Sequence, residues 1–66
     1  MEAYQQRVID EAKVVDFRRG ALKEFTETDV FSALPDKERT LLNAQFLAMT
    51  TYYDILLQRI ELFEED

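Results

Sequence analysis

The stretch "LLNAQFLAMTTYYDILLQRIELF", residues 41–63, decides the fold. Its large apolar side chains recur at alternating steps of four and three residues, which is the spacing of a helix packed along a coiled-coil-like seam. The spacing predicts one long helix from about residue 35 to residue 63, closed against another helix along this series. We call the series the inner stripe, and it consists of Leu42, Phe46, Met49, Tyr53, Leu56, Ile60 and Phe63.

A second series runs beside the inner stripe on the same predicted helix. Because neighbouring residues on a helix are about 100° apart, the two series together cover about half of the circumference. One partner helix is too narrow to cover so much surface, so we expect other copies of the chain to cover the second series. We call this series the outer stripe, and it consists of Leu41, Gln45, Ala48, Tyr52, Ile55, Arg59 and Leu62.

The first half of the chain has the same kind of period. Apolar side chains recur with helical spacing from Tyr4 through Val8 and Val15 to Phe25, which predicts a helix over about residues 2–25. The sequence therefore indicates an all-α fold, a two-helix antiparallel hairpin that assembles as a homo-oligomer.

A short helical turn is expected between the two helices, over residues 28–34. Thr26 or Thr28 is suited to cap it, because a threonine hydroxyl accepts a hydrogen bond from a free backbone N–H. Pro35 suits the first turn of the second helix, where its missing N–H costs nothing. Residues 1–66 then form a single hairpin domain, and we expect its acidic ending, residues 64–66, to be a solvated tail.

The composition of the chain excludes several kinds of functional site. The 66-residue chain has no cysteine and no histidine, which removes disulfides, the commonest metal ligand and the commonest general base. We expect no metal and no cofactor. Because so short a chain is marginal as a monomer and has no such staple, oligomerisation is the expected remedy.

The net charge of −6 argues against binding of duplex nucleic acid or anionic membranes. With no signal peptide or membrane span in the sequence, we expect a cytoplasmic protein.

No residue pattern indicates catalysis. The sequence has no serine–histidine or cysteine–histidine pair and no glycine-rich phosphate loop. Adjacent acids such as Asp10 and Glu11 do not face each other on a helix. We therefore expect a protein that is not an enzyme.

A basic cluster stands out in this acidic chain. Lys13, Arg18, Arg19 and Lys23 lie within eleven residues with a single acid, Asp16, among them. One interpretation is ion pairing on the helix surface, which contributes only about 0–1 kcal/mol per pair. The other is a ligand with negative charge, since guanidinium groups beside aromatic rings bind phosphates and stack on bases.

Two residues, Arg18 and Gly20, favour the ligand. Arg18 and Glu11 interrupt the apolar series 4–8–11–15–18–22–25 that should face the second helix. A buried arginine needs a negative partner, which is either a ligand or Glu11 across helices or chains. Gly20 has no side chain, so a backbone or a planar ligand could approach it closely. Arg59 interrupts the outer stripe, where it either pairs across an oligomer interface or enters a pocket between subunits.

Three segments resemble a known family. They are an opening Tyr-Gln-x-Arg-Val at residues 4–8, a central Leu-x-x-Phe-x-x-Ser/Thr-x-x-Phe-x-x-Leu at 22–34, and a closing Tyr-x-x-Ile-Leu-x-x-Arg-Ile-x-x-Phe at 52–63. In this order and spacing they resemble, over nearly the whole chain, the small phage hairpin proteins of the anti-CBASS and anti-Thoeris sponge family. That resemblance implies helical hairpins that interlock into homo-oligomers, commonly hexamers, with ligand pockets between protomers.

The resemblance also implies a function. Such proteins bind cyclic nucleotide immune signals, either cyclic oligonucleotides or cyclic ADP-ribose derivatives, and hold them without cleavage in the cytoplasm of the infected bacterium. By position it implies Tyr4 as the base-stacking residue, Arg7 and Arg59 as phosphate ligands, and Thr28 as the polar residue of the turn.

The predicted ligand-binding residues from both lines of reasoning are Tyr4, Arg7, Arg18, Arg19, Gly20, Thr28 and Arg59. Residues 16–21 read "DFRRGA" where the family usually has lysines, so the ligand of this chain stays open. The alternative function is an oligomeric protein–protein interaction module with no small-molecule ligand, in which the arginines make only ion pairs between chains.

Overall fold

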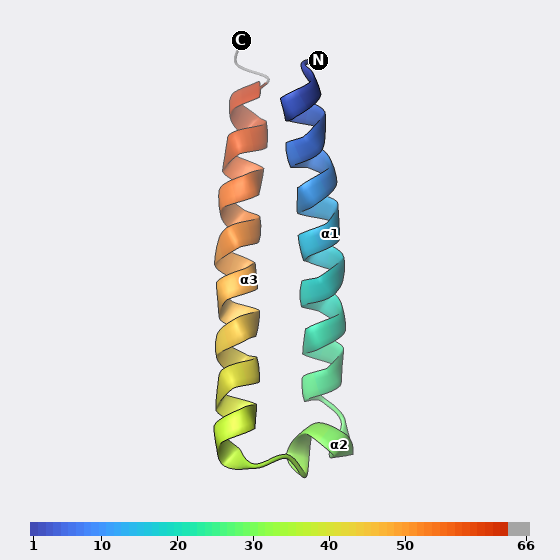
Figure 1. The fold of residues 1–66 in the computed structure, drawn as a ribbon, viewed down its shortest axis with the longest axis vertical. Coiled ribbons are helices and arrows are strands. Elements are labelled where there is room, and N and C mark those ends of the chain that lie inside the picture. Colours follow the sequence, from blue (N-terminus) through green and yellow to red (C-terminus); the bar gives the residue numbers. More distant parts are fainter. Residues whose placement is uncertain (64–66) are drawn as a thin grey trace.

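The computed structural model describes residues 1–63 and shows an antiparallel helical hairpin (Figure 1). Helix α1 spans Ala3–Thr26, the single-turn helix α2 spans Asp29–Ser32, and helix α3 spans Asp36–Phe63. Both termini of the described chain lie at the same end, opposite α2. The expected acidic tail, residues 64–66, lies outside the described residues.

Each helix begins where the sequence offers a cap. At the start of α1 the backbone N–H of Glu2 donates to Oε1 of Gln5 at 2.9 Å. The Thr28 hydroxyl accepts from the Phe31 N–H at 3.2 Å, so Thr28 caps α2, which confirms one of the two predicted caps. Pro35 immediately precedes α3, and its carbonyl accepts from the Arg39 N–H at 3.1 Å. Its missing N–H therefore leaves no helical hydrogen bond unmade.

The inner stripe faces α1, as the spacing predicts. Leu56 is only 1% exposed, and Met49, Tyr53, Ile60 and Phe63 pack around it, partly buried. From α1 the buried residues are Val8, Ala12 and Val15. This core is thin, since only one large side chain in the described part of the chain is almost fully buried.

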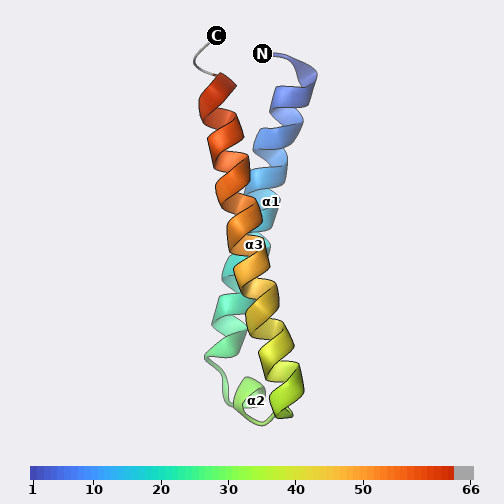
Figure 2. The ribbon, with the colours of Figure 1, turned by 90° about the vertical axis from the view of Figure 1, so that its left-hand side faces the viewer.

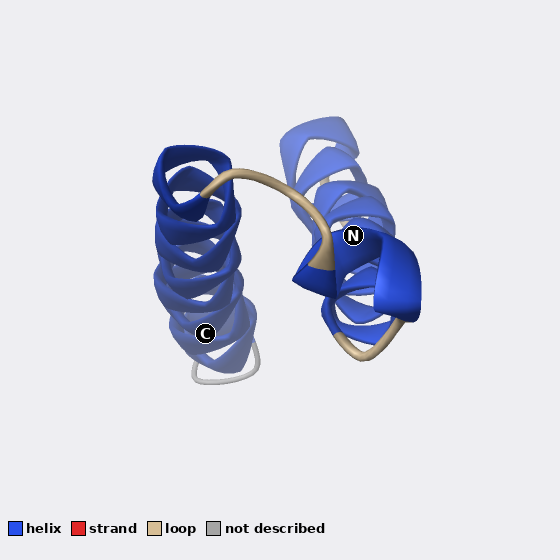
Figure 3. Cartoon of the chain, turned by 90° about the horizontal axis from the view of Figure 1, so that it is seen from below, coloured by secondary structure: helices blue, strands red, loops and turns tan. Residues whose placement is uncertain are grey.

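The turn end is closed by aromatic side chains. Phe31 of α2 packs edge-on against Phe25 of α1, with ring centroids 6.1 Å apart. Figure 3 views this end, where α2 lies beside the end of α1 and a loop crosses to α3.

The hairpin is long and thin, with extents of 49 × 14 × 14 Å (Figure 2). Its radius of gyration is 15.1 Å, against about 11 Å for a compact domain of this length. It exposes 5161 Å², whereas folded monomers of this mass expose about 4,400 Å². The excess includes the outer stripe, in which Leu41, Ile55 and Leu62 are 62%, 50% and 58% exposed.

No helix in residues 1–63 is both long enough and apolar enough to cross a membrane.

Candidate functional site

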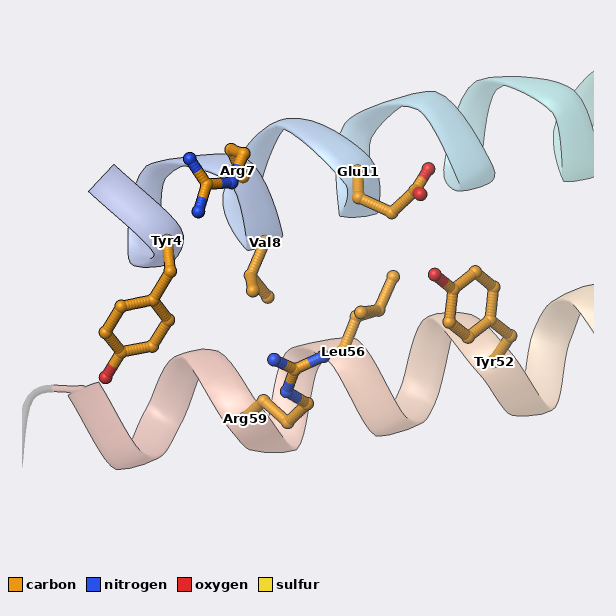
Figure 4. Close-up of a pocket in the computed structure, with 7 residues that line it drawn as sticks. All are labelled: Tyr4, Arg7, Val8, Glu11, Tyr52, Leu56 and Arg59. Atoms are coloured by element: carbon orange, nitrogen blue, oxygen red, sulfur yellow. The ribbon is translucent and has the colours of Figure 1, made fainter. Parts of the chain in front are cut away.

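A hollow of about 270 Å³ lies between the N-terminal half of α1 and the C-terminal half of α3 (Figure 4). Two aromatic rings, two guanidinium groups, one carboxylate and two aliphatic side chains surround it. They belong to Tyr4, Arg7, Val8, Glu11, Tyr52, Leu56 and Arg59.

Helical spacing brings these residues together. On α1, steps of three and four residues place Tyr4, Arg7 and Glu11 along one edge of the helix. On α3, Tyr52 and Arg59 are seven residues apart, which is two turns along the outer stripe. Since the helices run antiparallel, the beginning of α1 meets the end of α3, and residues more than fifty positions apart in sequence share one hollow.

Two tyrosines mark the two ends of the hollow (Figure 4). The Tyr4 ring packs edge-on against Phe63, with centroids 5.8 Å apart and an interplanar angle of 86°. This contact fixes the ring and leaves it 50% exposed, and Tyr52 is 43% exposed. Half-exposed rings of this kind offer a face on which a planar base can stack.

The charge of the hollow comes from Arg7, Arg59 and Glu11. Within residues 1–63 the ion pairs join Arg19 to Asp16 and Arg39 to Asp36, and neither arginine of the hollow belongs to them. A guanidinium group donates several hydrogen bonds in a planar fork that matches a phosphate. The hollow therefore combines phosphate-binding groups with stacking surfaces, and its floor is the apolar pair Val8 and Leu56.

The predicted orientation of Arg18 was wrong. The buried series on α1 is Val8, Ala12 and Val15, and the partly buried Arg19 continues it, so Arg18 and Glu11 are exposed instead of packing in the core between the helices. The helix is rotated from the expected series because the small Ala12, in place of Glu11, packs against the core around Leu56. Arg18 lies seven residues beyond Glu11 on the same edge of α1, or about 10 Å farther from the hollow.

Arg19 is the arginine that faces α3. Its guanidinium carbon lies 4.8 Å from the centre of the Tyr53 ring, and its Nη2 donates to Asp16 at 2.7 Å. A cation over an aromatic face contributes about 0.5–2 kcal/mol, depending on burial. The ion-pair interpretation therefore holds for Arg19, although its acid belongs to its own helix.

The basic cluster does not form one patch. Lys13 and Lys23 are each five residues from Arg18, which places them about 140° around the helix from it. Gly20 is exposed, and a side-chain Cβ at this position would meet nothing within 4 Å, so no contact within residues 1–63 requires a glycine there. Thr28 lies at the turn end, where its hydroxyl also donates to the Phe25 carbonyl at 2.7 Å.

The structure thus brings Tyr4, Arg7 and Arg59 together and leaves the other predicted residues outside their hollow. Sequence reasoning did not place Tyr52 and Glu11 in the site. Tyr52 had a usable signal, since it precedes Arg59 by two helical turns on the outer stripe. Glu11 had a misleading one, because it was interpreted as an interruption of the core-facing series.

The chain is similar to known proteins over nearly its whole length. The model of the Sequestin family matches residues 2–62. A protein of Enterobacteria phage T4, described as an uncharacterized 7.5 kDa protein in the denB-rIIB intergenic region, is 36% identical over 64 residues. That alignment covers 97% of this chain and all of the phage protein. No solved structure matches the chain. The family name and the phage relative confirm the resemblance to phage sequestering proteins.

Proposed function

The chain belongs to the Sequestin family, and we propose that it sequesters a cyclic nucleotide messenger. The ligand class is a cyclic oligonucleotide or a cyclic ADP-ribose derivative, one of the signals by which infected bacteria activate their defences. The family name denotes sequestration; the nature of the ligand is our proposal. The protein binds the messenger inside the infected cell and lowers its free concentration below what the host effector needs.

The observation that carries this proposal is the composition of the hollow. In a chain with a net charge of −6, it gathers two arginines that have no carboxylate partner in residues 1–63. The half-exposed rings of Tyr4 and Tyr52 flank them. Arginine forks on phosphates together with rings on bases form the usual combination for binding a nucleotide without reading its sequence.

A second copy of the chain fits this proposal. Ligand pockets usually enclose about 300–1,000 Å³, and the hollow of one chain, at about 270 Å³, falls just below that range. Tyr52 and Arg59 belong both to the hollow and to the exposed outer stripe. A copy that covers the outer stripe therefore also borders the hollow, and we propose that the working protein is a homo-oligomer with its pockets between protomers.

Sequestration needs no chemistry on the ligand. The chain has neither histidine nor cysteine, and within residues 1–63 Glu11 is the one carboxylate that lines the hollow. We propose binding without turnover, in which an excess of tight sites removes the messenger by mass action.

A binding panel tests the proposal. Cyclic di-AMP, cyclic di-GMP, cyclic GMP–AMP and cyclic ADP-ribose are titrated into the protein by calorimetry, and the bound ligand is then released by heat and analysed by chromatography. We expect one class to bind and to be recovered intact. Tyr4→Ala and Arg59→Ala should each weaken binding, the tyrosine by about 5- to 150-fold, because stacking contributes about 1–3 kcal/mol per base.

Lys37→Ala is the matched control for Arg59→Ala. It removes one positive charge from α3 at an exposed position outside the hollow, and it should leave affinity unchanged. If no panel member binds while the oligomer is intact, the protein is an interaction module instead of a sponge. If the ligand is recovered cleaved, it is an enzyme.

A further inference from the structure

Glu11 is out of place in a site for anions. Its carboxylate lies in the same hollow as Arg7 and Arg59, yet no ion pair within residues 1–63 includes it. In Figure 4 the Arg7 side chain extends toward Tyr4, whereas the Glu11 side chain extends in the opposite direction, to the Tyr52 end of the hollow. Glu11 is therefore a carboxylate that still has its acceptor oxygens available.

This arrangement divides the hollow into two ends. Arg7 lies at the Tyr4 end, with Arg59 across from it on α3, and Glu11 lies at the Tyr52 end (Figure 4). An ionised carboxylate only accepts hydrogen bonds. We therefore expect a ligand in the hollow to place its phosphates between the two arginines. A hydroxyl or amino group of the ligand should then lie beside Glu11.

Resting on the proposed function, we propose that Glu11 determines specificity by rejecting ligands that carry a terminal phosphate. Among residues 1–63, the two arginines and Glu11 give the lining of the hollow a net charge of +1. A phosphodiester carries one negative charge, whereas a terminal phosphate carries about −1.5 to −2 at pH 7. A cyclic messenger has only the former. The linear form of a cyclic oligonucleotide, or a phosphorylated cyclic ADP-ribose, would bring the extra charge into the range of the Glu11 carboxylate, where like charges disfavour binding.

For a sponge this selectivity has a direct use. Opened cyclic oligonucleotides and nucleoside monophosphates bear terminal phosphates, and they would otherwise occupy the arginines without relieving the host signal. The Glu11 carboxylate lowers the affinity of the site for every anion. It lowers the affinity for a terminal phosphate most, so the site stays available for the cyclic form.

Two pairs of probes test the role of Glu11. The first is cyclic di-GMP against its linear form pGpG, and the second is cyclic ADP-ribose against its 2′-phosphate. Calorimetry measures both pairs on the wild-type protein, Glu11→Gln, Glu11→Asp and the control Glu24→Gln. Glu24 is an exposed acid on the same helix outside the hollow, so the control makes the same change in net charge.

We expect the wild type to prefer the cyclic or less phosphorylated member of its pair by at least about tenfold. Glu11→Gln should bind the more charged member more tightly and reduce this preference to below about threefold, whereas Glu11→Asp and Glu24→Gln should retain it. If the wild type binds a cyclic probe and Glu11→Gln leaves the preference unchanged, the role of Glu11 is refuted while the sponge stands. If the wild type binds neither pair, the role of Glu11 is refuted for these ligands, and the sponge itself is refuted only if cyclic di-AMP and cyclic GMP–AMP also fail to bind.

Discussion

Ile55 is the residue at which the assembly can be tested most sharply. It lies in the middle of the outer stripe, is 50% exposed, and precedes Leu56, which is 1% exposed. Fully burying an isoleucine side chain contributes about 1.5–3 kcal/mol, so half of that, about 0.8–1.5 kcal/mol, remains to be gained when a second copy covers it. Ile55→Glu loses this gain and places an unpaired carboxylate in the contact, which costs several kcal/mol more.

A hairpin whose outer stripe is covered by a second copy and a hairpin that is stable alone predict different outcomes for Ile55→Glu. If a second copy covers the outer stripe, association should weaken by at least about 3 kcal/mol, or roughly 150-fold. Sedimentation at micromolar concentration should then report a single chain that melts early, while the wild type remains an oligomer whose melting temperature rises with concentration. If the hairpin is stable alone, Ile55→Glu is a surface change worth less than about 0.5 kcal/mol.

Asn43→Glu is the control, since it adds the same charge to an exposed position of α3 outside both stripes. It should leave mass and melting temperature unchanged. An Ile55→Glu variant with the mass and stability of the wild type would refute the covered outer stripe, and with it the pocket between protomers.

Two further substitutions test the hairpin itself. Leu56→Ala removes the one large side chain that is almost fully buried in the described residues, and it should cost about 2–5 kcal/mol, measured by urea denaturation, because it leaves a cavity in a thin core; a loss below about 1 kcal/mol would contradict the packing described here. Gly20→Ala fills open space within α1 and should raise the melting temperature by about 4–8 °C, since alanine favours a helix by about 1 kcal/mol. A lower melting temperature or weaker ligand binding would instead show that another chain or a ligand rests on Gly20.

The fold followed from spacing because the inner stripe is continuous. Seven apolar residues in steps of four and three leave a helix only one way to face its partner, and every member of the inner stripe is buried or partly buried in the structure. On α1 the spacing was ambiguous. Both 8–11–15–18 and 8–12–15–19 are helical series, and the choice depends on whether Glu11 or Ala12 packs against α3. Periodicity alone did not weigh the size and charge of those two side chains.

The candidate site was harder to predict because it depends on that same rotation. A turn of α1 by one residue, about 100°, decides whether Glu11 joins the hollow and whether Arg18 or Arg19 meets Tyr53. Tyr4, Arg7 and Arg59 were identified from motif positions, which do not require the rotation to be known. Only the three-dimensional structure shows that they share one hollow. Residues 7 and 59 come together only when α1 and α3 lie side by side and antiparallel, in the register that the structure shows.

The proposed assembly and the proposed ligand binding would be coupled through two shared residues. Tyr52 and Arg59 lie on the outer stripe and also line the hollow. In the proposed oligomer, the neighbouring copy that covers the stripe therefore restricts the same side chains that hold the ligand. Fixing a long arginine side chain costs about 1.5–2 kcal/mol of rotamer entropy, and a neighbour that has already fixed it spares the ligand this cost. By thermodynamic linkage, a ligand that binds the oligomer more tightly also strengthens the oligomer by the same factor. In the proposed oligomer, a chain of 66 residues with a thin core can therefore be marginal as a single hairpin and still hold its ligand firmly, because the contacts between copies also restrict the side chains of the site.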